Sequence, residues 1–262
     1  MEKQVLYLVT AVPPGREEER AARKKFRGLP SFNKYRCVLE GRKLKIVNKL
    51  TGEAFAIDSR KLRIRRCQKR VHAWASALNE VIKLVGVKYR MMMVRLSYAP
   101  GYDWQPLQIS HLITKVRYEL GDDLIAYAWV AELQERGAVH YHLLMIVKKG
   151  TDIPYFDDAA WWIYGSTHHC TARSPFYICS YTAKENYQKF GVFPKGLRMY
   201  AIWIAPGIVS SSARRLLRLT ALPSWVAKIA RAVEDFMVKR HLGGGWDING
   251  ELVASPYRLD RT

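Results

Sequence analysis

The sequence has few cysteines, and none of them are spaced as a Cys-x-x-Cys pair. This scarcity argues against a disulfide scaffold and predicts reduced, mostly buried thiols. The chain also lacks any apolar run near the ~18 residues of a membrane span. Its first residues show no long apolar region followed by a small-residue cleavage site. We therefore expect a protein that works in the cytoplasm. The four cysteines are Cys37, Cys67, Cys170 and Cys179.

Acidic residues are also scarce. The 262 residues include 43 Lys+Arg but only 23 Asp+Glu, which gives a formal net charge of +20. Such an excess is typical of proteins that meet a polyanion, nucleic acid above all, although a merely basic surface is the simpler explanation. The chain has no Gly-x-x-x-x-Gly-Lys-Ser/Thr loop, internal repeat or low-complexity tract. It therefore shows no sign of a nucleotide-driven motor of its own.

Hydrophobic residues, at 49 % of the chain, are numerous enough to form a core. The spacing of apolar residues and turn signals predicts alternating strands and helices. We infer an α+β fold, with a central antiparallel sheet of the RRM-like βαββαβ type and helices packed on it. The expected strands are 90–98, 124–133, 139–147, 166–172 and 197–204, and the expected helices are 68–84, 107–120, 157–163 and 175–189.

Three regions follow from this pattern: a basic N-terminal extension (1–87), a central domain (88–204) and a helical C-terminal extension (205–262). In the first, strands are expected near 35–40, 43–48 and 53–58. In the last, helices are expected over 212–219 and 224–240. Arginines are dense in 60–66, where the run can follow a phosphate backbone or form a solvated edge strand. The candidate DNA-binding arginines of this run are Arg60, Arg63, Arg65 and Arg66.

Two histidines separated by one residue lie in an apolar, strand-like run. Side chains alternate along a strand, so His140 and His142 project from one face. A hairpin turn centred on Arg136 pairs Glu132 with His140 and brings this carboxylate to the same face. Two imidazoles and a carboxylate suit Mn²⁺ or Mg²⁺ acting on a phosphate, and Zn²⁺ can bind them too. The competing interpretation is a half-exposed sheet face that carries polar residues.

The expected helix over 175–189 carries a second candidate group. At 3.6 residues per turn, Tyr177, Tyr181 and Lys184 share one helix face. An ammonium beside a phenol favours the ionised phenol, which helps it to act as a nucleophile. Tyrosines at this spacing are also common in cores and interfaces, so the pattern gains weight only beside the metal-site candidate.

Together these motifs resemble the HUH endonuclease superfamily, and in particular the rolling-circle replication initiators (Rep proteins) of phages and plasmids. The strand pair His-x-His precedes a helical Tyr-x-x-x-Tyr-x-x-Lys, as in that family. The pattern Trp-x-x-Glu-x-x-x-Arg-Gly-x-x-His-x-His, from Trp129 to His142, is typical of such initiators. So are a first strand motif, here 93–98, and a strand with arginine after the helix, here with Arg198. The resemblance covers about 88–204.

The resemblance implies a nicking and joining chemistry on single-stranded DNA. A divalent ion held by His140, His142 and Glu132 polarises the scissile phosphodiester. A tyrosine then attacks phosphorus, which gives a 5′-phosphotyrosine and a free 3′-OH that primes synthesis. In the two-tyrosine group Tyr181 and Tyr177 alternate, and Lys184 steadies the developing charge. An origin hairpin or duplex and a host helicase and polymerase are the implied partners.

The chain departs from the family pattern at two places. Ser180 stands where many relatives carry lysine, and Arg95-Leu-Ser97 replaces the usual Thr-Leu-Thr. The serine leaves open a single-tyrosine enzyme that uses Tyr181 alone. An HUH transposase and a relaxase, which usually adds a third histidine, are competing hypotheses within the same superfamily. Outside it, the competing hypothesis is a single-stranded nucleic-acid-binding protein without catalysis.

Overall fold

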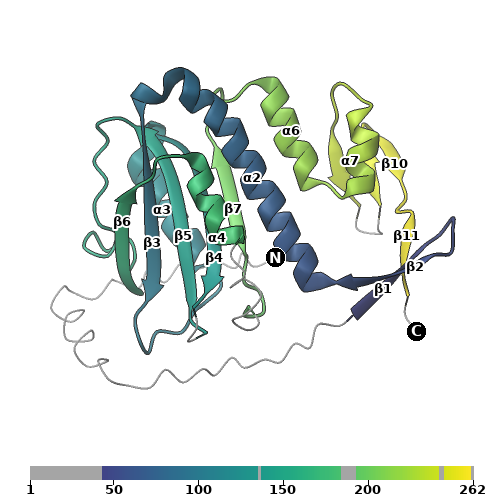
Figure 1. The fold of residues 1–262 in the computed structure, drawn as a ribbon, viewed down its shortest axis with the longest axis horizontal. Coiled ribbons are helices and arrows are strands. Elements are labelled where there is room, and N and C mark those ends of the chain that lie inside the picture. Colours follow the sequence, from purple (N-terminus) through teal and green to yellow (C-terminus); the bar gives the residue numbers. More distant parts are fainter. Residues whose placement is uncertain (1–42, 135–136, 184–192, 242–244, 261–262) are drawn as a thin grey trace, which may run out of the picture.

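The computed structural model describes residues 43–134, 137–183, 193–241 and 245–260. Its largest element is a five-stranded antiparallel sheet (Figure 1). The α+β class with a central antiparallel sheet is thereby confirmed. The strand order is β6 (Gly165–Thr171), β3 (Tyr89–Tyr98), β5 (Val139–Lys148), β4 (Leu124–Leu133) and β7 (Tyr200–Ile204).

The chain order differs from the predicted βαββαβ repeat. After β3 come α3 (Gln108–Leu120), β4 and β5, as predicted, but β6 follows directly and precedes α4 (Cys179–Ala183). The segment 157–163, predicted to be a helix, forms turns. With β6 beside β3 and β7 beside β4, the sheet gains a strand at each edge of the central β3-β5-β4 trio. The RRM-like topology is therefore not confirmed.

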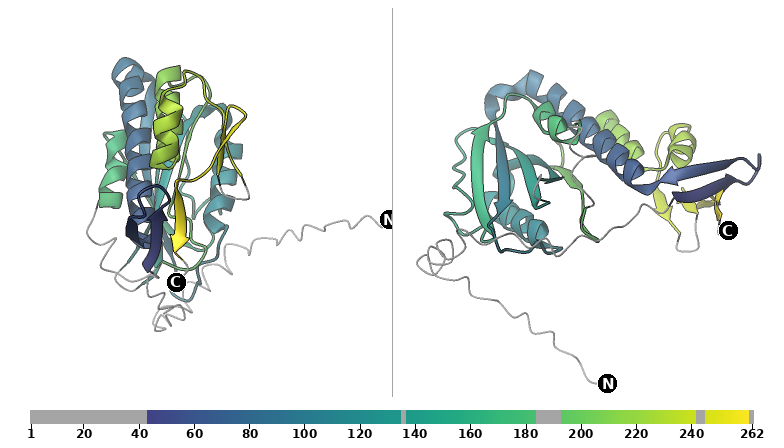
Figure 2. Two further views of the ribbon diagram at one scale, coloured as in Figure 1. Left: turned by 90° about the vertical axis from the view of Figure 1, so that its right-hand side faces the viewer. Right: turned by 60° about the horizontal axis from the view of Figure 1, so that its bottom comes forward.

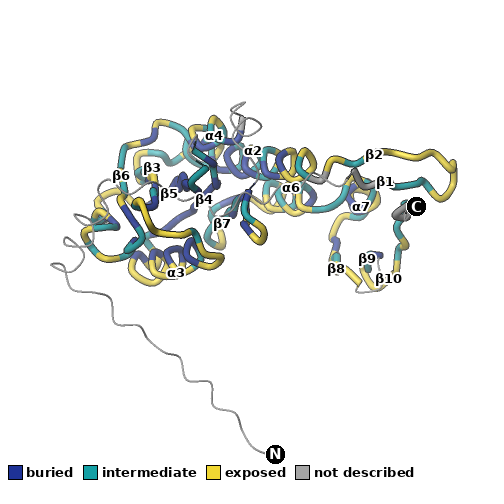
Figure 3. The backbone as a smooth tube through the Cα atoms, turned by 90° about the horizontal axis from the view of Figure 1, so that it is seen from below, coloured by how far each residue is buried: buried dark blue, intermediate teal, exposed yellow. Residues whose placement is uncertain are grey.

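Helices cover both faces of the sheet (Figure 3). Helix α3 packs on one face with Ile109, Leu112 and Val116. The long α2 (Ser59–Val85) packs on the other with Val71, Trp74 and Leu78, and with α4 beside it. The indole Nε1 of Trp74 donates a 3.0 Å hydrogen bond to the carbonyl of Trp203. The sheet thus lies in the middle of a three-layer arrangement.

Helix α2 begins earlier than apolar spacing predicted. Asp58 caps its N-terminus by accepting a 2.9 Å hydrogen bond from the amide of Lys61. The arginine run 60–66 is consequently helical, and its interpretation as an edge strand is wrong. Because α2 packs on the sheet, the N-terminal region shares the core of the central domain; its independence, and that of the C-terminal region, stays a prediction. The predicted strand at 35–40 lies outside the described residues.

The C-terminal region is only half helical, which corrects the predicted helical extension. Helices α6 (Ser211–Ala221) and α7 (Ser224–Arg231) are followed by three short paired strands, β8 (Val238–Arg240), β9 (Trp246–Ile248) and β10 (Glu251–Val253). Arg215 of α6 ends α7 by donating hydrogen bonds to the carbonyls of Val233, at 2.5 Å, and Glu234, at 3.0 Å. This contact between helices is invisible to helical spacing in the sequence.

The last described strand returns to the N-terminal region. β11 (Tyr257–Asp260) pairs with β1 (Lys43–Asn48), which pairs with β2 (Ala54–Asp58), at the end of α2 that lies away from the large sheet (Figure 2). None of the helices in the described ranges combines the length and the apolar character that a membrane span requires.

Gly165 fixes the edge of the large sheet. A Cβ at this position would lie 2.0 Å from the carbonyl oxygen of Ser97, which is backbone and cannot turn aside. We expect Gly165→Ala to destabilise the protein by about 2 kcal/mol or more, because β6 must move away from β3. Thermal unfolding measures the effect. Gly86→Ala is the control, since its Cβ meets the side chain of Ile82 at 3.1 Å; equal losses in the two variants would contradict the prediction.

Candidate active site

The hairpin of β4 and β5 has the register expected from the sequence. Glu132 pairs with His140, and Val130 pairs with His142. These residues lie two apart on each strand, so Glu132, His140 and His142 share one face, the one on which α2 and α4 pack. The alternation of side chains and one tight turn were sufficient to place these three groups together.

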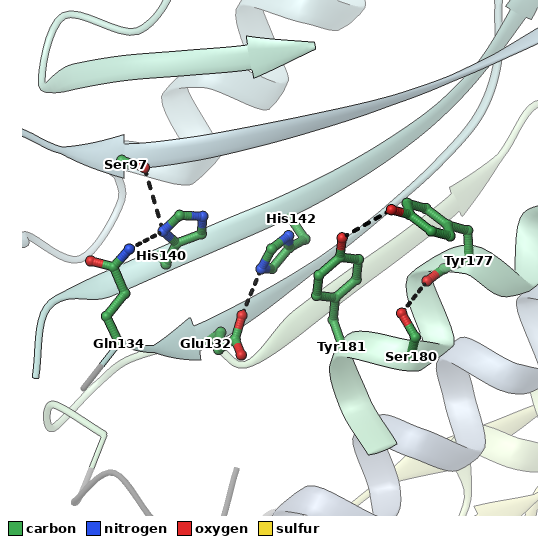
Figure 4. Close-up of polar contacts among 8 residues, drawn as sticks. All are labelled: Ser97, Glu132, Gln134, His140, His142, Tyr177, Ser180 and Tyr181. Carbon is green, nitrogen blue, oxygen red and sulfur yellow. Dashed lines mark hydrogen bonds and ion pairs between the residues drawn. The ribbon is translucent and has the colours of Figure 1, made fainter. Parts of the chain in front are cut away.

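Both histidines are buried, each with 4 % of its surface exposed, and each has polar partners (Figure 4). The Nε2 atom of His142 lies 2.7 Å from Oε2 of Glu132. The Nδ1 atom of His140 lies 2.8 Å from the amide nitrogen of Gln134 and 3.4 Å from the hydroxyl of Ser97. Gln134 and Ser97 therefore fix the ring of His140. Their role was not foreseen, although Gln134 has the same strand parity as Glu132.

The donor set fits a divalent ion in its chemistry. The two imidazole rings lie 4.9 Å apart, centre to centre, with the Glu132 carboxylate against one of them. Two nitrogens and a carboxylate oxygen suit Mn²⁺, Mg²⁺ or Zn²⁺. However, no three His, Cys, Asp or Glu side chains in the described parts of the chain are already arranged to hold a metal ion. Glu132 faces His142 as a hydrogen-bond partner, so coordination requires that this contact be exchanged.

Tyr181 lies directly on the histidine pair. Its ring stacks on His142 with centroids 3.6 Å apart and planes 18° from parallel. Its hydroxyl lies 3.5 Å from the hydroxyl of Tyr177, a residue 43 % exposed (Figure 4). The structure thus brings both tyrosines to the metal-site candidate. Lys184, the third member of the predicted helix face, lies outside the described residues.

The tyrosine-bearing segment is shorter and tighter than a continuous helix. Ser174 and Pro175 open a 3₁₀ turn, η3 (Pro175–Ile178), with the hydroxyl of Ser174 accepting from the amide of Phe176 at 3.1 Å. Helix α4 follows. The amide nitrogen of Gln68, on α2, donates a 2.9 Å hydrogen bond to the carbonyl of Thr182. This link fixes α4 against α2 and, with it, the position of Tyr181 over His142.

The surroundings of Tyr181 favour the neutral phenol. Burial raises its pKa above the usual value, and the hydrogen bond with Tyr177 and the nearby Glu132 carboxylate act in the same direction. The sequence predicts the opposite effect, from a lysine at 184 whose contribution lies outside the described residues. A phenol in this position needs a positive charge nearby before it can act as a phenolate.

Two cavities, of about 830 Å³ and about 400 Å³, lie outside the histidine and tyrosine cluster. The smaller, which we call the arginine cavity, is lined by Arg63, Arg66 and Arg70 of α2 and by Arg198, next to Tyr200 of β7. Tyr200 pairs with Val130, so this cavity borders the candidate site. Three of the predicted DNA-binding arginines meet there.

Arg60 and Arg65 do not line the arginine cavity. Arg70 was missed, although its spacing of four and seven residues from Arg66 and Arg63 is the helical signal for a shared face. Several of these guanidinium groups also hold the fold: Arg63 donates a 2.7 Å hydrogen bond to the carbonyl of Leu197. Each guanidinium has five N–H groups, so one such bond leaves donors for a phosphate.

The strand register adds two further polar groups on the same face. His142 pairs with Arg95 on β3, and Arg95 pairs with His168 on β6. Both side chains are exposed. Arg95 stood out in the sequence only as a departure from a motif. The row from Tyr200 through His142 and Arg95 to His168 therefore crosses all five strands beside Tyr181.

One family of known proteins matches part of the chain. Residues 91–186 match the family of replication-associated proteins of the ORF2 type. This segment runs from β3 through α4 and includes Glu132, both histidines and both tyrosines. No curated protein and no solved structure matches the chain. The match supports a role in DNA replication and is consistent with a replication initiator.

Proposed function

We propose that this protein is a site-specific single-stranded DNA endonuclease and strand transferase. It nicks a replication origin through a 5′-phosphotyrosine intermediate and so initiates rolling-circle replication in the cytoplasm of the host cell. The observation that carries the proposal is the stack of Tyr181 on His142, itself in contact with Glu132. These groups lie within the segment that matches the replication-associated family.

His140, His142 and Glu132 would hold the divalent ion, Mn²⁺ or Mg²⁺. When bound, the ion supplies positive charge that polarises the scissile phosphodiester. Gln134 and Ser97 hold Nδ1 of His140, which leaves coordination to its Nε2. Burial of both imidazoles excludes water and strengthens the attraction between these groups and a cation.

The tyrosine hydroxyl supplies the nucleophile. The Tyr181 oxygen forms a bond to phosphorus as the bond between phosphorus and the 3′ oxygen breaks. The phenol loses its proton, and the departing 3′ oxygen gains one to become the primer hydroxyl. A free 3′-OH reverses these steps when it attacks the phosphotyrosine, which joins the strand. Lys184, on the resemblance to initiators, steadies the charge on the phosphate.

Tyr177 is placed to act as a second nucleophile. Its hydroxyl lies 3.5 Å from that of Tyr181, and it is exposed to an incoming strand. Two tyrosines at this separation allow one to hold the covalent strand while the other attacks the next phosphodiester. The geometry therefore favours the two-tyrosine group over an enzyme that uses Tyr181 alone.

The single strand would follow the basic row across the sheet. The arginines of the arginine cavity lie on one side of Tyr181, and Arg95 with His168 lies on the other. Arginine forks bind phosphate oxygens in pairs, which positions the backbone without reading sequence. Unwinding and synthesis would come from a host helicase and polymerase.

A relaxase and a non-catalytic platform are less well supported. His168 is the nearest further histidine on this face, but Arg95 stands between it and His142. An RNA-recognition platform presents exposed aromatic rings on its central strands. In the described sheet the corresponding rings of Tyr127, Trp129 and Tyr141 are buried, at 7 %, 2 % and 1 % exposed. The sheet faces are covered by helices instead.

The proposal is tested by incubating the full chain and Mn²⁺ with single-stranded DNA from the origin of its own replicon. We expect a covalent protein–DNA adduct, seen as a slower band in a denaturing gel, whose modified peptide contains Tyr181. A matched reaction with a chelator should give none. Cleavage that leaves no adduct, or an adduct on a residue other than the two tyrosines, would overturn the proposed mechanism.

The arginine cavity makes a separate prediction for binding. Arg66→Ala with Arg198→Ala removes two cations that line it and is expected to weaken single-stranded DNA binding about tenfold at moderate salt. The slope of log affinity against log salt should fall by about 1.4, the release of two phosphate contacts. Arg65→Ala is the matched control, an exposed arginine of α2 outside the cavity. An equal loss in this control would contradict a defined path.

A further inference from the structure

The larger of the two cavities lies at the other end of the sheet from Tyr181. Its volume is about 830 Å³, and it opens where β3 begins and β4 and β5 meet their loops. Four cationic side chains line it, with one carboxylate, Asp122. We call it the basic end pocket; its cations are Lys88, Arg117, Lys148 and Lys149.

Two of these cations are held in place by neighbours. The guanidinium of Arg117 lies 5.0 Å from the ring centre of Trp203, which is stacked on Tyr127 at 5.7 Å. The ammonium of Lys148 lies 3.1 Å from the carboxylate of Asp123. A cation fixed in this way loses little further freedom when it binds an anion. The pocket is thus an organised array of positive charge.

The aromatic content argues for the phosphate backbone of a duplex rather than for unpaired bases. Proteins that bind single strands present open ring faces on which bases stack. The ring of Trp203 is already engaged by Tyr127 and Arg117. Cations without a free stacking surface contact phosphates and position a duplex.

The distance to the candidate active site suits one DNA molecule. His142 and Lys148 lie on the same strand, six residues apart, which corresponds to about 20 Å. That length equals about six base-pair steps of a B-form duplex. A duplex arm beside the nick site can therefore reach this pocket while its single-stranded part lies at Tyr181.

We propose that the basic end pocket binds the phosphate backbone of the double-stranded arm adjoining the nick site. This inference rests on the proposed nicking function and adds a second DNA contact, remote from the chemistry. The pocket would set how far the cleaved phosphodiester lies from the junction of duplex and single strand. It would thus act on the choice of nick site without touching the reacting atoms.

The test compares two DNAs on the full chain, without metal. One is the origin single strand, and the other is the same strand with a duplex arm of about ten base pairs, enough to span the distance argued above. Lys88→Ala with Lys149→Ala is expected to weaken binding of the armed DNA about tenfold and to lower its salt slope by about two. Binding of the single strand should stay unchanged. Both lysines are exposed, so the fold should be unaffected.

Lys228→Ala with Arg231→Ala, on α7, provides the matched control for a general loss of charge. The inference is overturned if this control weakens the armed DNA equally, or if the pocket variant weakens both DNAs alike. Inorganic phosphate and a nucleoside triphosphate are tested as competitors. Should either be bound by the wild type and lost in the pocket variant, with armed DNA unaffected, the site is a small-anion site and the proposal fails.

The two proposals fail separately. If no covalent adduct ever forms but the armed DNA is still preferred through Lys88 and Lys149, the nicking function is wrong and the pocket assignment stands. If the adduct forms on Tyr181 and the pocket variant binds both DNAs like the wild type, the pocket assignment is wrong. Arg117→Lys, which keeps the charge but loses the planar fork, should weaken binding of the armed DNA alone.

Discussion

Tyr181→Phe is expected to abolish covalent attachment to DNA and to lower the nicking rate by about 10³-fold or more, because it removes the attacking oxygen. The ring that stacks on His142 is retained, and only the hydroxyl with its 3.5 Å contact to Tyr177 is lost. Folding and metal binding should therefore be those of the wild type. The measurement is adduct formation in a denaturing gel under single-turnover conditions.

Tyr177→Phe is the matched variant for the same experiment. It lies one helical turn away and contacts the same hydroxyl, so general damage to α4 would affect both variants alike. We expect it to keep the first nick and to lose the second transfer, which needs a free nucleophile after the first is occupied. An adduct that persists in Tyr181→Phe and disappears in Tyr177→Phe would exchange the two roles. Undiminished cleavage in both would remove tyrosine from the mechanism.

The part of this site that depends on local periodicity was predictable. One turn position and the alternation of side chains placed Glu132 opposite His140 and on the face of His142, and the structure has that register. The helix that ends at Gly121 and the strands β3 to β5 follow from the same kind of pattern. Short-range rules suffice where the chain turns back on itself within a few residues.

Contacts between distant segments could not be read in this way. The position of Tyr181 over His142 depends on Gln68, more than a hundred residues earlier, which holds the end of α4. The end of α7 depends on Arg215, which takes up carbonyl groups from another helix. The arginine cavity needs α2 beside β7. In each case the deciding partner is far away in the sequence, so no window of local spacing contains it.

The charge balance of the site explains why these distant contacts matter. Burial and the Glu132 carboxylate both raise the pKa of Tyr181, so the fold alone holds the nucleophile in its neutral form. The same burial makes a cation between Glu132 and the imidazoles more favourable than it would be in water. The arrangement is therefore consistent with a site that becomes reactive only when positive charge is supplied, by metal, DNA-bound cations or both.

His140→Ala tests that dependence on a metal. His140 lies away from the Tyr181 stack and contacts Gln134 and Ser97, so the change leaves the nucleophile in place. We expect metal-dependent nicking to fall by about 10²–10³-fold, as for loss of a group that stabilises the charge of the transition state. Titration of the metal-free protein with Mn²⁺ in a calorimeter should show a matching loss of affinity.

His168→Ala provides the control, because it removes an exposed histidine from the same face, two strands away from His142. Its Mn²⁺ affinity should be that of the wild type, even if its DNA binding is weaker. Gln134→Ala should fall between the two, with metal affinity lowered by about 10–100-fold, since it only orients the ring of His140. If His140→Ala binds Mn²⁺ and nicks DNA like the wild type, the histidine pair is a buried polar cluster and the phosphate chemistry must be sought elsewhere.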